Sequence, residues 1–165
     1  MDFVMSLPLS KVGHIVYDAI LVVIDCLTKM AHYIPTHKDL DAPGLAETIL
    51  QEVVSHHGVP DSIVTDRGSI FTSEYWSTLC YYMRIRRRLS TAFHPQTDGQ
   101  IEWQNQTLEQ YLHSYVNYQQ NDWVTLLPIA EFAYNNAVHA TTGVAPFFAV
   151  YGYTPKMEDG LPKDP

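Results

Sequence analysis

A run of aliphatic and β-branched residues over 17–24 (YDAILVVI) is the feature that most constrains the fold of this chain. β-branched side chains favour extended backbone, so the run predicts a buried strand. Two more strands are predicted over 2–7 and 30–34, and Pro35 is expected to end the second of them. A polar connection over 9–14 separates the first two strands. The three strands are expected to form an antiparallel meander.

Helical patterns follow the meander. Residues 42–57 are predicted to form a helix that stops at Gly58. A central strand over 63–65 comes next, and then a helix over 73–83 with Ser73 as its N-cap. Further helices are expected over three segments, which are 101–120, 123–138 with Asp122 as the N-cap, and 145–151. A meander followed by strands that alternate with helices predicts a mixed α/β domain with a central five-stranded sheet.

The bulk composition fits one globular domain. The chain has 165 residues, of which 46% are hydrophobic and 17% are charged. We expect this domain to cover 1–155 and the segment 156–165 to be a linker or tail. No apolar run approaches the length of a membrane span, so no membrane contact is expected. Cys26 and Cys80 lack the spacing of a zinc site or of a disulfide framework.

The charge balance gives a mixed signal about nucleic acid. The formal net charge of −8 at pH 7 disfavours a strong DNA-binding surface, which usually carries a basic footprint. The basic run of the sequence consists of Arg84, Arg86, Arg87 and Arg88. Arginines on an edge strand can simply prevent aggregation. They can also contact phosphate groups, and the sequence leaves both interpretations open.

Three carboxylates lie where secondary-structure elements begin or end. Asp66 follows the strand at 63–65, whereas Glu102 opens the long helix after a loop at 94–99, and 35 residues lie between the two acids. A third acid, Asp2, lies on the first predicted strand. Mg²⁺ prefers oxygen ligands and is typically held by one or two carboxylates together with substrate phosphates. The three acids therefore predict a site for hard divalent cations.

The trio Asp2, Asp66 and Glu102 resembles the D,D-35-E signature of retroviral and retrotransposon integrases. Longer stretches resemble the integrase core of gypsy-type LTR retrotransposons, namely MDFVMSLP, LVVIDCLTKMAHYIP, HHGVPDSIVTDRGSIFTS, RRRLSTAFHPQTDGQIE and NQTLEQYL. The similarity runs from Met1 to about Pro155, which is nearly the whole chain.

This resemblance implies a ribonuclease-H-like fold and a polynucleotidyl transferase that integrates DNA. It implies that Asp2, Asp66 and Glu102 are the catalytic residues and hold two Mg²⁺ or Mn²⁺ ions, with Asp66 bridging the ions. The implied reactions are processing of the element's DNA 3′ ends by water and joining of those ends to target DNA. A loop over 93–99 would cover the scissile phosphate. The tentative DNA-binding residues are Phe93, His94, Pro95, Gln96, Asn105 and Gln106.

The resemblance also implies partners and a location. The expected partners are element DNA, target DNA and further copies of the chain. Members of the family also carry an N-terminal zinc-binding domain and a C-terminal basic domain, which are expected to be missing from these residues and to supply most of the DNA affinity. Synthesis in the cytoplasm within a polyprotein and action on chromosomal DNA in the nucleus are expected.

Asp25 and His94 each have more than one interpretation. Asp25 follows the central apolar run and is an alternative first metal ligand, but it also suits a local turn with Thr28 and Lys29. Asp2 is preferred because the catalytic aspartate of the family lies in the MDFV stretch. His94 is interpreted as a loop histidine without a catalytic role.

Two other functions compete with integration. An inactive or domesticated core could act as a DNA-tethering or dimerisation module, although the intact trio argues against it. A nuclease of ribonuclease H type would ordinarily use more acids and would lack the HPQTDGQ stretch. The chain departs from the family pattern at Cys26, where an arginine is common, and at Ile101 and Trp103, which flank Glu102 where threonine and arginine are usual.

Overall fold

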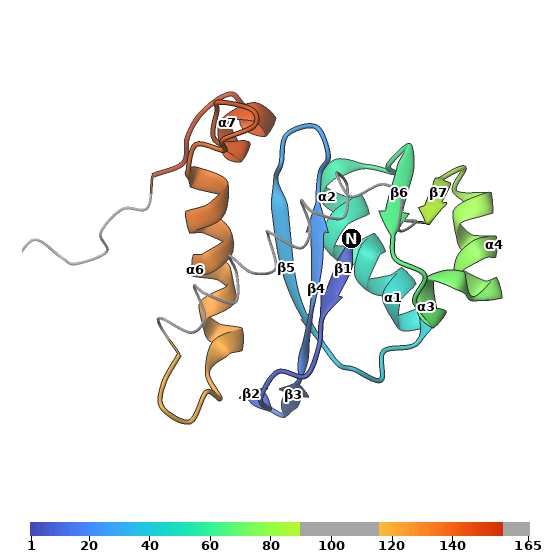
Figure 1. Ribbon diagram of the computed structural model, residues 1–165, viewed down its shortest axis with the longest axis horizontal. Coiled ribbons are helices and arrows are strands. Elements are labelled where there is room, and N and C mark those ends of the chain that lie inside the picture. Colours follow the sequence, from blue (N-terminus) through green and yellow to red (C-terminus); the bar gives the residue numbers. More distant parts are fainter. Residues whose placement is uncertain (90–115, 157–165) are drawn as a thin grey trace, which may run out of the picture.

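Three antiparallel strands form the centre of the molecule. The computed structural model describes residues 1–89 and 116–156 (Figure 1). The strands β1 (Asp2–Val4), β4 (Ala19–Ile24) and β5 (Ala31–Thr36) form one sheet in the order β1-β4-β5. Asp2 lies opposite Val22 in the β1–β4 register. The predicted meander is therefore confirmed.

Two local features near the meander differ from the prediction. The expected polar connection contains a hairpin of β2 (Ser10–Val12) and β3 (Ile15–Tyr17), turned at Gly13 with a φ of +61°. The strand β5 does not end at Pro35, which lies opposite Ile20 inside the β4–β5 pairing. Among the described strands β5 pairs only with β4, and proline is tolerated on such an edge because its missing N–H can fall on the unpaired side.

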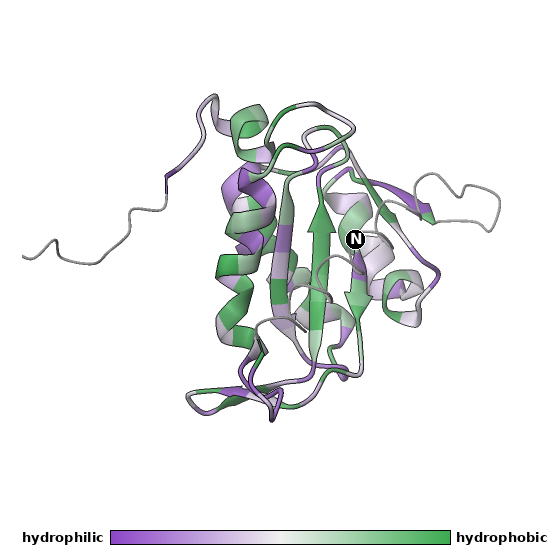
Figure 2. Cartoon of the chain, turned by 60° about the vertical axis from the view of Figure 1, so that its left-hand side comes forward, coloured by the Kyte–Doolittle hydropathy of each residue, from purple (hydrophilic) through white to green (hydrophobic). Residues whose placement is uncertain are grey.

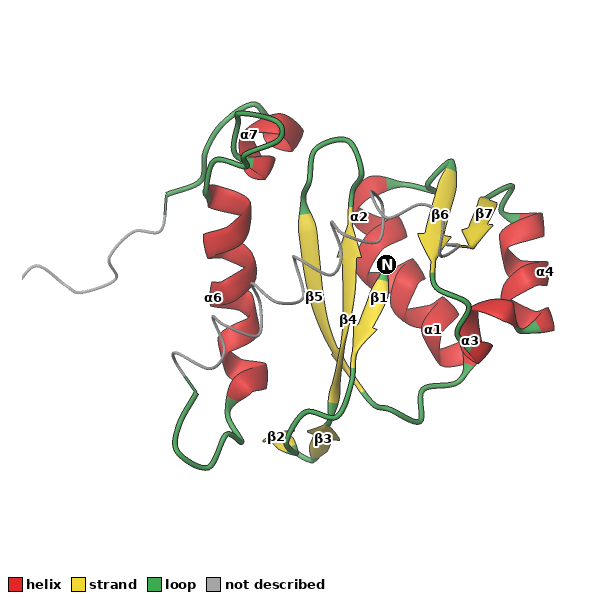
Figure 3. Ribbon diagram, in the orientation of Figure 1, coloured by secondary structure: helices red, strands yellow, loops and turns green. Residues whose placement is uncertain are grey.

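A second, parallel pair of strands lies beside β1. The strands β6 (Ser62–Thr65) and β7 (Arg86–Leu89) pair in parallel. The Met1 amine donates a hydrogen bond of 2.8 Å to the Val64 carbonyl, so the start of β1 is joined to β6. Apart from the β2–β3 hairpin, the described strands therefore follow one another in the order β5, β4, β1, β6 and β7 (Figure 3).

Helices cover both faces of the sheet. One face carries a continuous helical stretch of α1 (Ala42–Ile49), a π-helical turn η1 (Leu50–Val54) and α2 (Ser55–His57), which matches the helix predicted over 42–57. The short helix α3 (Ser69–Thr72) precedes α4 (Glu74–Tyr82). Ser73 caps α4 as predicted, since its hydroxyl accepts a hydrogen bond from the Trp76 N–H.

The opposite face is covered by α6 (Trp123–Asn136), and α7 (Pro146–Tyr151) packs at its end (Figure 1). None of the helices in the described part of the chain is long and apolar enough to cross a membrane.

The strand β4 is buried between these two layers. Ile20 and Val22 pack in a cluster with α6, whereas Leu21 packs in a second cluster with α1 and α4. All three side chains have no exposed surface. The uniformly apolar colour of β4 in Figure 2 reflects this two-sided burial, which explains why the sequence run lacks polar alternation.

The segment before α6 is not helical where the structure describes it. The sequence predicts that the long helix continues to Gln120, but 116–120 form a turn in which Gln120 has a φ of +55°. Asp122 does not cap α6 through its side chain either, because its Oδ1 accepts the Asn117 N–H at 3.1 Å. The asparagine-rich sequence competes with the helix by offering these local hydrogen bonds.

The helix α6 pairs with the outer edge of β5 through side chains. The Asn135 amide accepts the Ala31 N–H at 2.9 Å and donates to the Ala31 carbonyl at 2.8 Å, and its side chain is fully buried. One turn earlier, Glu131 Oε2 accepts the Tyr33 N–H at 2.8 Å. These bonds satisfy backbone groups that an edge strand would otherwise leave open.

Replacing Asn135 with alanine is expected to lower the free energy of unfolding by about 2–4 kcal/mol, because two buried backbone groups of Ala31 lose their partners. Urea unfolding measures this change. Asn136→Ala is the matched control, since the Asn136 Oδ1 atom is buried without a partner in the described structure. A loss for Asn135→Ala no larger than that for Asn136→Ala would contradict the role of Asn135.

A second set of contacts ties β5 to α2. His32 Nδ1 lies 3.2 Å from Glu131 Oε1, and His32 Nε2 lies 2.9 Å from His57 Nε2. Burial lowers the pKa of His57, and the nearby His32 and His56 lower it further, whereas Asp25 opposes the shift. Protonation of His57 is therefore less favourable in the folded chain than in the unfolded chain.

A lowered histidine pKa stabilises the fold above the unfolded pKa of about 6.5, and this contribution is lost as the pH falls through the folded value. The melting temperature is therefore expected to fall between about pH 7.5 and about pH 5.5, and His57→Gln should reduce that fall by roughly a few degrees at most. His14→Gln is the control, because His14 is exposed in the β2–β3 turn, away from His57. Equal pH dependence in both variants would refute the assignment.

Candidate catalytic site

Asp2 is placed by the central position of β1. The strand lies between β4 and β6, and Asp2 is partly buried there. Its Oδ1 atom accepts the Phe3 N–H at 2.8 Å. The backbone at this point is thus held from both sides by neighbouring strands, which fixes where the carboxylate can lie.

Asp66 is placed by the end of β6. It follows Thr65, which is buried, and is itself exposed to solvent. Its Oδ1 atom accepts the Gly68 N–H at 2.9 Å, so the turn after the strand orients the carboxylate. A Cβ atom on Gly68 would lie 3.0 Å from the same oxygen, so glycine permits this close approach.

The start of β1 lies beside β6. The Met1 N–H donates to the Val64 carbonyl at 2.8 Å, two residues before Asp66, and Met1 directly precedes Asp2. Asp2 and Asp66, which are far apart in the sequence, therefore lie on neighbouring segments at the junction between β1 and β6.

The remaining predicted site residues lie outside the described residues. They are Glu102 and the tentative DNA-binding residues Phe93, His94, Pro95, Gln96, Asn105 and Gln106. Within 1–89 and 116–156, no group of three or more His, Cys, Asp or Glu side chains is arranged to hold a metal ion. The assignment of Asp2, Asp66 and Glu102 as ligands stays a prediction.

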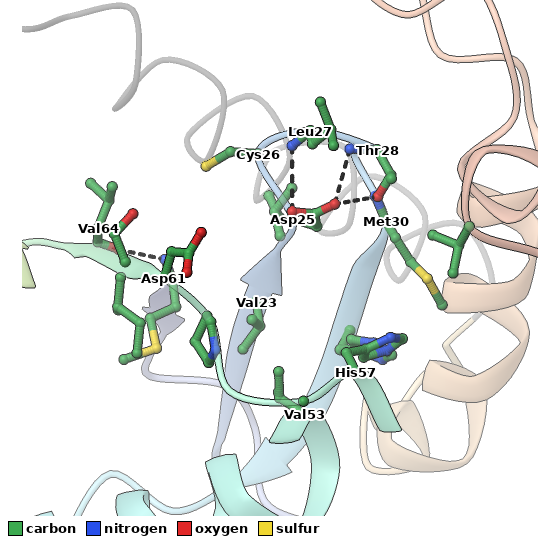
Figure 4. Close-up of a pocket in the computed structure, with 18 of the residues that line it drawn as sticks. Val23, Asp25, Cys26, Leu27, Thr28, Met30, Val53, His57, Asp61 and Val64 are labelled. Atoms are coloured by element: carbon green, nitrogen blue, oxygen red, sulfur yellow. Dashed lines mark hydrogen bonds between the residues drawn. The ribbon is translucent and has the colours of Figure 1, made fainter. Parts of the chain in front are cut away.

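Asp25 adopts the local turn that was its alternative interpretation. Its Oδ2 atom accepts the Thr28 hydroxyl at 2.6 Å and the Thr28 N–H at 3.0 Å (Figure 4). Burial alone would raise the pKa of the Asp25 carboxyl, but the hydrogen bonds from Thr28 and Leu27 and the charge of Lys29 outweigh it and lower the pKa. The carboxylate is already used to close the β4–β5 turn.

A cavity of about 650 Å³ lies next to this turn (Figure 4). Its lining combines residues of the β4–β5 turn, α2, the α2–β6 connection and α7, including Asp25, His32, His57 and Asp61. The sequence alone does not predict this cavity or the His32–His57 contact. No local pattern signals them, because the residues that meet here are distant in the chain.

Comparison with known proteins gives sequence relatives among retrotransposons. No family model matches the chain. The chain is 36% identical over 157 residues to the Transposon Tf2-3 polyprotein of Schizosaccharomyces pombe, and the Tf2-4 polyprotein of that organism matches equally. The match covers 95% of this chain but only 12% of each polyprotein, so the chain spans about an eighth of the length of these curated relatives.

Solved structures with a similar fold are retroviral integrases. The HTLV-2 integrase catalytic core domain in complex with magnesium has a TM-score of 0.64 and 18% identity, with 88% of this chain and 93% of that one covered. The catalytic core domain of BIV integrase has a TM-score of 0.62 and 20% identity, with coverage of 79% and 84%. At these identities the likeness establishes the fold.

A simian T-cell lymphotropic virus intasome structure is also similar, with a TM-score of 0.70 and 18% identity over 98% of this chain and 58% of that one. The chain is thus similar in sequence to part of the Tf2 retrotransposon polyproteins, and it has the ribonuclease-H-like fold of retroviral integrase catalytic cores.

Proposed function

We propose that this chain is the catalytic core of an integrase that processes the 3′ ends of element DNA and joins them to target DNA. The observation that carries the proposal is the hydrogen bond from the Met1 N–H to the Val64 carbonyl, which places the strand that holds Asp2 beside the strand that Asp66 follows. In a chain with this fold, such a placement supports a shared phosphoryl-transfer site. Glu102 is proposed as the third acid of that site.

The chemistry of the two described acids fits a hard divalent cation. Both offer carboxylate oxygens, the ligands that Mg²⁺ prefers. Asp66 is exposed, and within the described residues its Oδ2 atom accepts no hydrogen bond. The magnesium bound to the HTLV-2 core domain supports the same ion for this chain. We propose that Asp66 contacts two ions and that Asp2 and Glu102 each contact one.

Two such ions would stabilise the negative charge that develops on the attacking and leaving oxygens of an in-line displacement. The protein's own contribution is positional. The Gly68 N–H holds Asp66 at the end of β6. Pairing with β4 and the bond from Met1 to Val64 hold the strand of Asp2. In processing, a water oxygen bonds to phosphorus as the bond to the 3′-oxygen breaks. In joining, that 3′-hydroxyl attacks a target phosphate and displaces the target's own 3′-oxygen.

We also propose that the chain works as an oligomer on DNA. Similar structures are described as a dimeric form, a trimeric form and an intasome, which supports assembly of this chain as well. The polyprotein context of the Tf2 relatives supports synthesis as part of a longer chain, and action on chromosomal DNA would place the mature protein in the nucleus.

Strand transfer onto plasmid DNA with Mg²⁺ or Mn²⁺ tests the function. Asp66→Asn is expected to reduce the product by about 100-fold or more, because removing a direct ligand should cost at least as much as removing an outer-shell partner. Asp25→Asn is the matched control and should keep most of the activity, since Asp25 is engaged in its own turn. Melting curves check that both variants are folded.

Full activity of a folded Asp66→Asn protein would refute the proposed site. An inactive wild-type chain would favour the tethering or dimerisation module instead.

A further inference from the structure

The arginines of this chain are gathered in one region. All five lie between 67 and 88, in a chain whose formal net charge is −8. Arg84 precedes β7 at the end of α4, and Arg86, Arg87 and Arg88 lie on β7 itself. Arg67 directly follows Asp66. The densest positive charge of the described structure therefore lies on one side of the candidate catalytic site.

These arginines form no ion pair in the described part of the chain. All five arginine side chains are exposed. Within the described residues the ion pair is formed by His32 and Glu131, and no arginine has a carboxylate partner. Exposed arginines without a carboxylate partner leave positive charge with which an anionic partner can pair.

The three arginines of β7 divide between the two faces of the strand. Arg87 lies opposite Ile63, and its guanidinium donates to the Phe71 carbonyl at 3.4 Å on the face that carries α3 and α4. Arg86 and Arg88 lie opposite Ser62 and Val64. Because side chains alternate along a strand, Arg86 and Arg88 project together from the face that Arg87 avoids.

The register places this pair beside the proposed site. Strands β6 and β7 are parallel, and Leu89 lies opposite Thr65, the residue before Asp66. Arg88 lies opposite Val64, which accepts the Met1 amine. Two residues along a strand cover about 6.6 Å and neighbouring strands lie about 4.8 Å apart. The Arg88 backbone is thus about 8 Å from that of Asp66, within reach of a long side chain.

We propose that Arg86 and Arg88 form a contact surface for the phosphate backbone of the DNA that occupies this site. The proposal rests on the proposed integrase function. The guanidinium group presents a planar fork of donors that matches phosphate oxygens, whereas a compact lysine charge would suffice to keep an edge strand from aggregating. This surface binds DNA through the charge of the phosphates and does not distinguish base sequences.

Salt dependence of DNA binding tests this surface without any chemistry. The full 165-residue chain binds a fluorescent duplex in EDTA, and the affinity is measured by anisotropy between about 20 and 200 mM salt. Each lost phosphate contact lowers the slope of log K against log salt by about 0.9. The double variant Arg86→Ala/Arg88→Ala is expected to lose about two units of slope and to bind different sequences equally weakly.

Arg87→Ala is the matched control on the same strand. It should keep the wild-type slope and instead lower the melting temperature, since it loses the contact with Phe71. Arg86→Gln/Arg88→Gln replaces the alanine variant if that protein does not fold, and the same loss of slope is expected. An unchanged slope in the double variant, an equal loss in Arg87→Ala, or no binding by wild type at the lowest salt overturns the proposal.

Strand transfer by the same wild-type preparation keeps the two proposals separate. A chain that shows the expected slopes but transfers no strands retains the arginine surface and refutes the integrase activity. A chain that transfers strands while the double variant keeps the wild-type slope retains the activity and refutes the surface.

Discussion

The backbone hydrogen bond from the Met1 N–H to the Val64 carbonyl is the contact on which the candidate site depends. It joins an antiparallel three-stranded sheet to a parallel two-stranded sheet, and neither sheet alone brings two acids together. Asp2 comes from the first sheet and Asp66 from the end of β6. The candidate site is therefore a property of the junction, and anything that loosens β1 would separate the two carboxylates.

The outer layers keep β1 in place. All of β1 pairs with β4, and β4 is buried between α6 and the α1–α4 layer. The far side of β4 is held by β5, whose open edge is in turn paired by Asn135 and Glu131 of α6. The stability of the junction is thus set partly by contacts at the opposite edge of the sheet. These contacts need no ligand and no metal.

Much of this architecture could be predicted from the sequence because local patterns decide it. The apolar run over 17–24 located β4, Ser73 located the start of α4, and Asp66 was correctly placed at the end of a strand. The hairpin near Gly13 was missed because its strands are only three residues long. The pairing of Asn135 with Ala31 was equally hidden, because it joins residues 104 positions apart and leaves no local signal.

Crystals of the chain grown with Mn²⁺ give the most direct test of the central claim, because the anomalous signal locates the ion itself. We predict a peak within coordination distance, about 2.0–2.3 Å, of carboxylate oxygens of both Asp2 and Asp66. A fully occupied peak at Asp25 or between His32 and His57, with none at Asp66, would contradict the account.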